Sequence, residues 1–164
     1  MKTNIIILLL ATLSTGVMAG IFFTWSNAVK PGIGKLTDIG YLESLQAMNK
    51  VILNPVFYIF FFAAVILIPV ATFLNYNSQP AYIVRLLLAA SIVYFAGVFL
   101  ITFFGNIPLN NILENTNLNE ATDLDTKKLR GIIEKKWNVY NLIRTLTSLI
   151  SFIILLITLV KASK

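Results

Sequence analysis

Four long stretches of nearly unbroken hydrophobic residues determine the predicted fold. They cover about residues 4–29, 55–74, 82–104 and 139–160. Each is long enough to cross a bilayer as a helix, which takes about 20 residues. The connections between consecutive spans are short enough to favour antiparallel neighbours. The pattern therefore predicts an all-α integral membrane protein, a single four-span domain (residues 1–164) folded as an antiparallel four-helix bundle.

The first span begins like a secretory signal peptide. Lys2 precedes an apolar run, and residues 17–19 (Val-Met-Ala) resemble the end of a cleavable leader. The apolar stretch nevertheless continues as far as Trp25, and this greater length favours a retained spanning helix. We expect the helix breakers at residues 30–34 (Lys-Pro-Gly-Ile-Gly) to end it.

Between the first and second spans, apolar residues recur at helical spacing: Ile39, Leu42, Leu45, Met48 and Ile52. This spacing predicts an amphipathic helix over Asp38–Leu53 that lies at the membrane face, with Gln46 and Asn49 on its polar side. Asn54 followed by Pro55 predicts an N-cap and a first-turn proline at the start of the second span.

The connection between the third and fourth spans, residues 105–138, is predicted to be partly helical. Gly105 is placed to end the third span as the first residue beyond its last turn. Residues 111–126 are rich in Asn and acidic residues, which is typical of a loop. We expect Asp123 or Asp125 to cap a new helix, a helical extension that can run unbroken into the fourth span.

A stripe of polar residues interrupts the hydrophobic pattern of this last helix. Its members recur every three or four residues and share one helix face; they are Trp137, Asn141, Arg144, Ser148 and Ser151. An arginine inside a spanning segment is costly unless it faces the bundle interior and is paired. The stripe is therefore expected to face the other helices.

Composition agrees with the membrane class and excludes several chemistries. The chain is 57% hydrophobic and 12% charged, about half the charged fraction of an ordinary soluble domain. It has no Cys and no His, which excludes thiol catalysis, His-ligated haem and the commonest general base. Its seven acidic residues all lie outside the apolar spans. We therefore expect neither a metal site nor another cofactor.

The net charge of +6 indicates membrane topology and contact with the lipid bilayer rather than nucleic acid. Eight Lys or Arg residues lie in the first and third loops, and four on the opposite side. This asymmetry favours a multi-pass protein of the bacterial inner membrane with loops 1 and 3 in the cytoplasm, although Lys2 before the first span argues for the reverse. The sequence indicates no particular protein partner.

Three groups of polar residues are expected to meet at the end of the bundle formed by these loops. They come from loop 1, from the end of the third span and from the start of the fourth: Gln46, Asn49, Asn106, Asn110, Trp137, Asn141 and Arg144. A set rich in donors and free of carboxylates suits an anionic oxygen ligand such as a phenolate, an enolate, a carboxylate or a lipid phosphate. The same residue types also join helices by hydrogen-bonding to backbone carbonyls.

Four segments resemble, in order, the motifs of one family. They are residues 20–31 (GIFFTWSNAVKP), 45–57 (LQAMNKVILNPVF), 106–110 (NIPLN) and 137–146 (WNVYNLIRTL). Together they are similar to a four-span domain family of unknown function that includes the fungal anthrone oxygenases. Many members carry a His beside the Asn of the last motif, where this chain has Leu142.

This resemblance implies a small membrane protein whose characterised relatives oxidise anthrones to anthraquinones with O₂, without metal or flavin. Stabilisation of the enolate oxygen would then fall to Arg144, Asn141 and Trp137. Substrate contacts would come from Gln46, Asn49, Asn106, Asn110 and Trp25, with Phe22 and Phe23 completing an aromatic wall. The proton would leave through the substrate's own acidity, a water molecule or a lysine such as Lys50.

Three functions remain open from the sequence. The leading hypothesis is a cofactor-independent oxygenase, an oxidoreductase acting on a lipophilic phenolic or enolisable substrate. The alternative is a non-catalytic membrane protein that binds a quinone, a lipid or another hydrophobic small molecule at the same site. The third is a structural subunit whose polar stripe only joins the helices.

Overall fold

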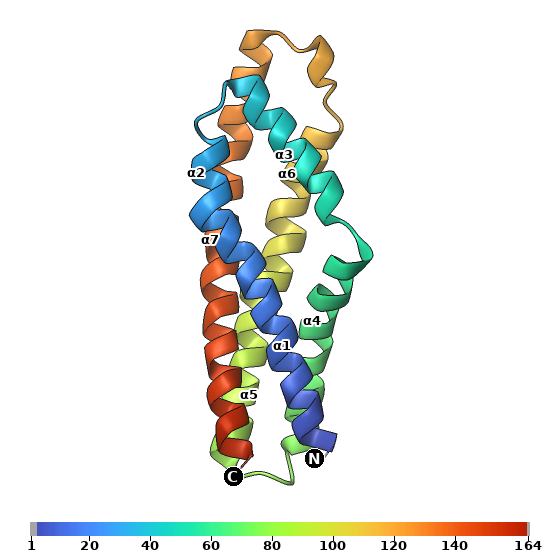
Figure 1. The fold of residues 1–164 in the computed structure, drawn as a ribbon, viewed down its shortest axis with the longest axis vertical. Helices are drawn as coiled ribbons and strands as arrows, with labels where there is room; N and C mark the ends of the chain where they lie inside the picture. The colour runs from blue at the N-terminus through green and yellow to red at the C-terminus, as the bar shows by residue number, and fades with distance from the viewer. Residues whose placement is uncertain (1–2, 164) are drawn as a thin grey trace.

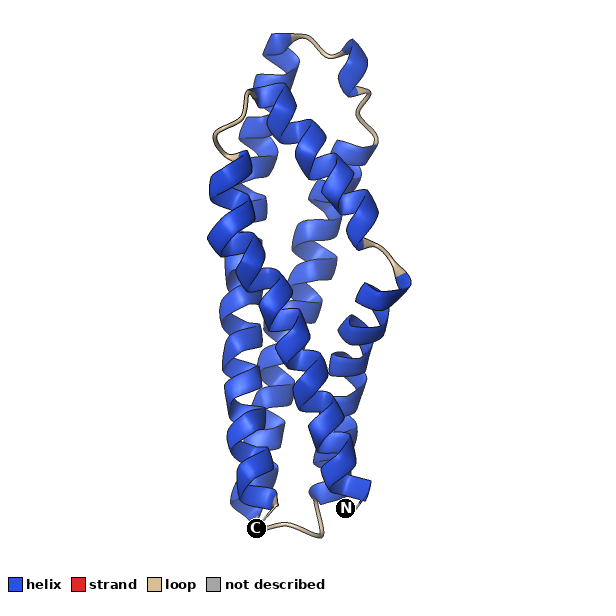
Figure 2. Ribbon diagram, viewed as in Figure 1, coloured by secondary structure: helices blue, strands red, loops and turns tan. Residues whose placement is uncertain are grey.

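The computed structural model describes residues 3–163, and its four long helices run alongside one another (Figure 1). They are Thr3–Ile33, Pro55–Asn75, Ala81–Glu114 and Asp123–Ala162, each long and apolar enough to cross a membrane. Both ends of the chain lie at the same end of the bundle (Figure 1). No strand is present within residues 3–163 (Figure 2). The predicted all-α bundle is confirmed, and it is consistent with a multi-pass membrane protein.

The first long helix ends within the breaker segment predicted to end it, residues 30–34. It consists of α1 (Thr3–Thr24), the π-helical segment η1 (Trp25–Val29) and α2 (Lys30–Ile33). The backbone N–H of Lys30 bonds to the carbonyl of Trp25, five residues back. Pro31 then stands in the first turn of α2, where its missing N–H does not interrupt the helix. The helix ends at Ile33, within the breaker segment of residues 30–34 as predicted, although Pro31 itself does not interrupt it.

The amphipathic helix of loop 1 is present as α3 (Asp38–Ile52), which crosses the loop end of the bundle (Figure 1). Thr37 caps it by accepting a hydrogen bond from the backbone N–H of Gly40 at 3.3 Å. The next helix, α4 (Pro55–Asn75), begins as predicted, because the Asn54 side chain accepts from the N–H of Phe57 at 3.0 Å.

The third long helix runs further than predicted. It consists of α5 (Ala81–Tyr94), the π-helical segments η2 (Phe95–Leu100) and η3 (Thr102–Asn106), and α6 (Ile107–Glu114). Gly105 does not end it, and no glycine among residues 3–163 has a positive φ. A Cβ at Gly105 would lie 2.9 Å from the ring of Tyr140. The glycine therefore permits close contact with the fourth helix rather than a helix end.

A short turn with the 3₁₀ segment η4 (Leu118–Glu120) leads to α7 (Asp123–Ala162). As predicted, the helical extension runs unbroken into the fourth span. Its N-cap is Thr122, however, and neither Asp123 nor Asp125. Thr122 accepts from the N–H of Asp125, whose carboxylate in turn accepts from the N–H of Thr122, both at 3.3 Å. This reciprocal capping box needs the hydroxyl at the cap and the acid three residues later.

Two hydrophobic cores stabilise the arrangement. The larger lies between the four spans, around Leu8, Met18, Ile68, Leu87 and Leu155. The smaller joins α3 to α6 and α7, around Tyr41, Leu42, Leu45, Leu113, Ile133 and Trp137. The polar stripe of α7 begins at this second core and runs into the first.

Candidate functional site

Two hydrogen bonds align the polar stripe of α7 with the third long helix. Trp137 Nε1 donates to Asn110 Oδ1 at 2.7 Å. Two turns deeper, Arg144 Nη1 donates to Thr102 Oγ1 at 3.5 Å. Asn106 lies between Thr102 and Asn110 along the third helix, and only 2% of its surface is exposed. It therefore occupies the level between these two contacts, on the side of the helix that packs against α7.

The π-helical segments of the third helix help to create this alignment. Deeper in the bundle, Ser151 Oγ donates to the carbonyl of Ala90 at 3.0 Å. Between this contact and the one at Asn110, the third helix advances through more residues than α7 does. A π-helix places more residues in each turn than an α-helix, and such segments are frequent at functional sites. η2 and η3 therefore shift which side chains of the third helix face α7.

Arg144 is buried, with 6% of its surface exposed. Its Nη2 donates to Asn141 Oδ1 at 3.0 Å. The guanidinium carbon lies 4.5 Å from the ring centre of Phe22 and 5.5 Å from that of Trp137. No ion pair among residues 3–163 involves Arg144, and its Nε has no hydrogen-bond partner there. A buried cation without a carboxylate is costly for folding and is ready to accept an anion.

The first long helix holds Asn141 from the opposite side. Asn141 Nδ2 donates to Ser26 Oγ at 2.9 Å and to the carbonyl of Phe22 at 3.3 Å. Thr145 Oγ1 donates to the same carbonyl at 3.0 Å and lies 2.9 Å from Ser26 Oγ. With its amide nitrogen fixed in this way, Asn141 directs its carbonyl oxygen at Arg144 and so orients the guanidinium.

Several buried polar atoms near this level have no hydrogen-bond partner among residues 3–163. They include both amide atoms of Asn106, the hydroxyl of Tyr94, the indole nitrogen of Trp25 and Arg144 Nε. Leaving such a group unpaired costs about 1–3 kcal/mol, so proteins rarely leave several together. Trp25 and Asn106 lie in the π-helical segments η1 and η3, and such a group of unpaired polar atoms is typical of a place that receives a polar ligand. We call Trp25, Asn106, Asn110, Trp137, Asn141 and Arg144, with Ser26 and Thr102, the arginine–amide cluster.

Within residues 3–163, neither Gln46 nor Asn49 forms a hydrogen bond with this cluster. Gln46 Nε2 donates to the carbonyl of Leu113 at 3.0 Å and thereby joins α3 to α6. Asn49 lies on the same helix, and its buried amide nitrogen has no hydrogen-bond partner within the part of the chain that the structure describes. Lys50 forms an ion pair with Glu114 at 3.1 Å, with 57% of its side chain exposed. This position places Lys50 outside the cluster in which a catalytic base would act.

Some of the predicted aromatic residues lie against the cluster, and others face away from it. The rings of Trp25 and Trp137 lie 4.6 Å apart at an interplanar angle of 47°, and Phe22 packs against Arg144. Phe23, by contrast, is 48% exposed and faces outward. Leu142, next to Asn141 in the chain, is likewise 47% exposed.

The larger core brings further aromatic surface next to Arg144. Phe22, Phe61 and Tyr94 belong to one buried cluster, against which Phe99 packs. The rings of Phe61 and Phe99 are stacked with their centres 6.2 Å apart. The arginine–amide cluster therefore borders on a region suited to flat apolar rings. Two hollows shown by the structure lie elsewhere, one beside Lys30 and one between the chain ends.

Sequence reasoning missed Ser26, Thr102 and Tyr94. Thr102 stands four residues before Asn106 and Tyr94 eight before Thr102, so a four-residue spacing in the third span was the available signal. Ser26 lies inside the first motif but is not distinguished from its neighbours by type. No group of three metal-ligating side chains occurs within residues 3–163.

Fold and site together define a four-span helical membrane protein with a buried arginine–amide cluster. Residues 51–154, more than half of the chain, match the family model described as Anthrone oxygenase. The chain therefore belongs to the anthrone oxygenase family, which confirms the resemblance seen in its motifs. The matched segment contains Asn106, Asn110, Trp137, Asn141 and Arg144. No curated protein and no solved structure matches the chain.

Proposed function

We propose that this protein is a membrane-embedded oxygenase that holds the oxygen of a lipophilic phenolic or enolisable substrate as an anion beside Arg144. The observation that carries the proposal is the buried guanidinium, which forms no ion pair within residues 3–163. In a low-dielectric interior a fixed positive charge favours an oxyanion over its neutral acid. Membership of the anthrone oxygenase family supports the same chemical class.

The cluster supplies separate groups for binding and for orientation. Arg144 Nε and the Asn106 amide are unpartnered within residues 3–163 and would donate to the substrate oxygen. Asn141 would keep the guanidinium directed at that oxygen through their 3.0 Å hydrogen bond. The faces of Phe22 and Trp137 would hold the guanidinium plane. The substrate rings would lie against the aromatic surface around Phe61.

The reaction at an enolisable methylene carbon needs one molecule of O₂ per substrate. The carbon first loses a proton, and the electron pair spreads to the oxygen held by Arg144. The carbanion then adds O₂ and takes up a proton to form a hydroperoxide. The second C–H proton leaves as the O–O bond breaks, giving a carbonyl group and water. Arg144 lowers the pKa of the substrate by stabilising its anion, so the substrate's own acidity drives the first step.

The test is O₂ uptake by the purified protein with an anthrone and a panel of hydroquinones. Arg144→Met and Asn106→Leu each remove one oxyanion donor, and such a loss typically lowers turnover on the order of 10²-fold to 10³-fold. Ser148→Ala is the matched control, because Ser148 is equally buried and donates within its own helix to Thr145 at 3.1 Å. We expect uptake to fall in the first two variants and to persist in the control.

Other outcomes identify the alternatives. Uptake by Arg144→Met equal to that of the unaltered protein would overturn the oxygenase proposal. Tight binding of a quinone or hydroquinone without turnover, lost in Arg144→Met, would identify a non-catalytic binding protein. Neither binding nor turnover, together with a marked loss of stability in Arg144→Met, would assign the cluster to helix packing alone.

A further inference from the structure

A second basic site lies on the outside of the bundle, between the end of the first long helix and α7. A hollow of about 410 Å³ is found there, and its lining includes Lys30, Arg130, Glu134, Lys135, Val139 and Leu142. None of these residues belongs to the arginine–amide cluster. The hollow therefore needs an explanation of its own.

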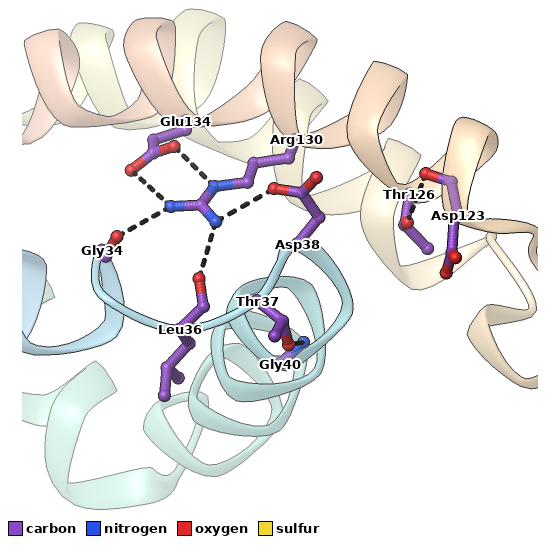
Figure 3. Close-up of polar contacts among 9 residues, drawn as sticks. All are labelled: Gly34, Leu36, Thr37, Asp38, Gly40, Asp123, Thr126, Arg130 and Glu134. Carbon is purple, nitrogen blue, oxygen red and sulfur yellow. Dashed lines mark hydrogen bonds and ion pairs between the residues drawn. The ribbon is translucent and has the colours of Figure 1, made fainter.

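Arg130 and Glu134 are already engaged within the protein (Figure 3). Arg130 donates to the Glu134 carboxylate at 2.8 and 3.5 Å and to Asp38 at 3.1 Å. It also donates to the backbone carbonyls of Gly34 and Leu36, each at 2.9 Å. Arg130 and Glu134 therefore neutralise each other's charge, and neither is free to bind a ligand.

Lys30 and Lys135 are the unengaged charges of the hollow. They come from different helices, both are exposed, and neither forms an ion pair among residues 3–163. Val139 and Leu142 follow Lys135 along α7 toward the hydrophobic span, and they are 48% and 47% exposed. The hollow thus has a cationic rim at the start of the apolar segment and an apolar floor below it.

We infer that this hollow binds an anionic phospholipid. The headgroup phosphate lies between the ammonium groups of Lys30 and Lys135, and an acyl chain runs along Val139 and Leu142. Charge complementarity at the rim selects an anionic headgroup, since each lysine near a membrane surface contributes to the attraction of acidic lipids. The apolar floor continues into the bilayer, where an acyl chain already lies. A free phosphate ion would use the rim alone.

Native mass spectrometry of the full chain in a neutral detergent tests this site with phosphatidylglycerol and phosphatidylcholine of equal chain length. The double variant Lys30→Gln/Lys135→Gln removes the two rim charges. Its control, Lys127→Gln/Lys128→Gln, removes two exposed charges of α7 that lie outside the hollow. We expect the first pair to lower phosphatidylglycerol affinity by on the order of 30-fold, about fivefold per lysine, and the control to change it less than about threefold.

Two further measurements separate a lipid from a free anion. Leu142→Ala should weaken phosphatidylglycerol binding by shortening the apolar floor, and millimolar inorganic phosphate should not displace the lipid. Equal affinity for both phospholipids, or equal losses in the two double variants, would overturn the proposal. Full displacement by phosphate would overturn the lipid assignment. O₂ uptake should be unchanged in Lys30→Gln/Lys135→Gln, so the lipid site and the proposed oxygenase activity are tested independently of each other.

Discussion

Trp137 donates its indole N–H to the side-chain oxygen of Asn110 at 2.7 Å, and this bond joins the outer end of the polar stripe to the third long helix. With the contact from Arg144 to Thr102, it brackets Asn106 and sets the depth of that side chain beside α7. The Asn106 amide has no hydrogen-bond partner within the described part of the chain, and its position depends on the alignment of two helices and not on its own helix alone.

Trp137→Phe should lower the free energy of unfolding by about 1–2 kcal/mol, because the substitution removes the hydrogen bond but keeps an aromatic ring. Denaturant unfolding of the purified protein in detergent measures the change. Asn110→Ala and the double variant complete a thermodynamic cycle. A coupling energy near zero would contradict the assigned contact.

Arg144→Met should leave the free energy of unfolding unchanged or raise it by about 1–2 kcal/mol while O₂ uptake is lost. The reason is that an apolar side chain of similar length avoids the desolvation of a buried cation that has no acidic partner among residues 3–163. Arg85→Met, at an exposed position of α5, is the control for loss of charge. Marked destabilisation of Arg144→Met alone would indicate that the arginine mainly stabilises the bundle.

Arg130→Gln should loosen loop 1 from α7, because the guanidinium joins Asp38 and two loop carbonyls to the helix. It also lies 4.6 Å above the ring of Tyr41; burial of that phenol, reinforced by the Glu134 carboxylate, raises its pKa and keeps it uncharged. We expect a loss of about 2 kcal/mol and faster hydrogen exchange over residues 34–41. Exchange as slow as in the unaltered protein would contradict this role.

Gly97→Ala should lower the free energy of unfolding by about 1–3 kcal/mol, which is the usual cost of overpacking a protein interior. A Cβ at Gly97 would collide with the side chain of Thr147 across the interface with α7. Gly20→Ala is the matched control, since no atom lies within 4 Å of its added Cβ. Thermal unfolding of both variants should show a loss only for the first, and equal stability would contradict the close contact.

Loops 1 and 3 should lie on the cytoplasmic side of a bacterial inner membrane, as their excess of basic residues indicates. The chain has no native cysteine, so single-cysteine variants can be labelled without background. In intact cells, a membrane-impermeant maleimide should label Asn77→Cys, in the opposite loop, and leave Lys128→Cys unlabelled. The reverse pattern would invert the topology.

Much of the fold followed from local patterns in the sequence. The four spans, the amphipathic helix of loop 1 and the cap at Asn54 depend on hydrophobic length, helical spacing and contacts over a few residues. The helix end expected in residues 30–34 was confirmed at Ile33, whereas the one expected at Gly105 was wrong. Glycine permits a break but does not force one, and Gly105 instead packs against Tyr140 within a continuous helix.

By itself, the sequence determined the membrane class, the family and the polar face of the last helix, because residue type and periodicity carry that information. It also identified Arg144, Asn141 and Trp137 as a group on one face. Only the tertiary structure decided which partners meet them. Ser26 and Thr102 reach the group through π-helical segments, whereas Gln46 bonds to a backbone carbonyl. Each of these contacts depends on the relative rotation and depth of two packed helices, which no single helix specifies.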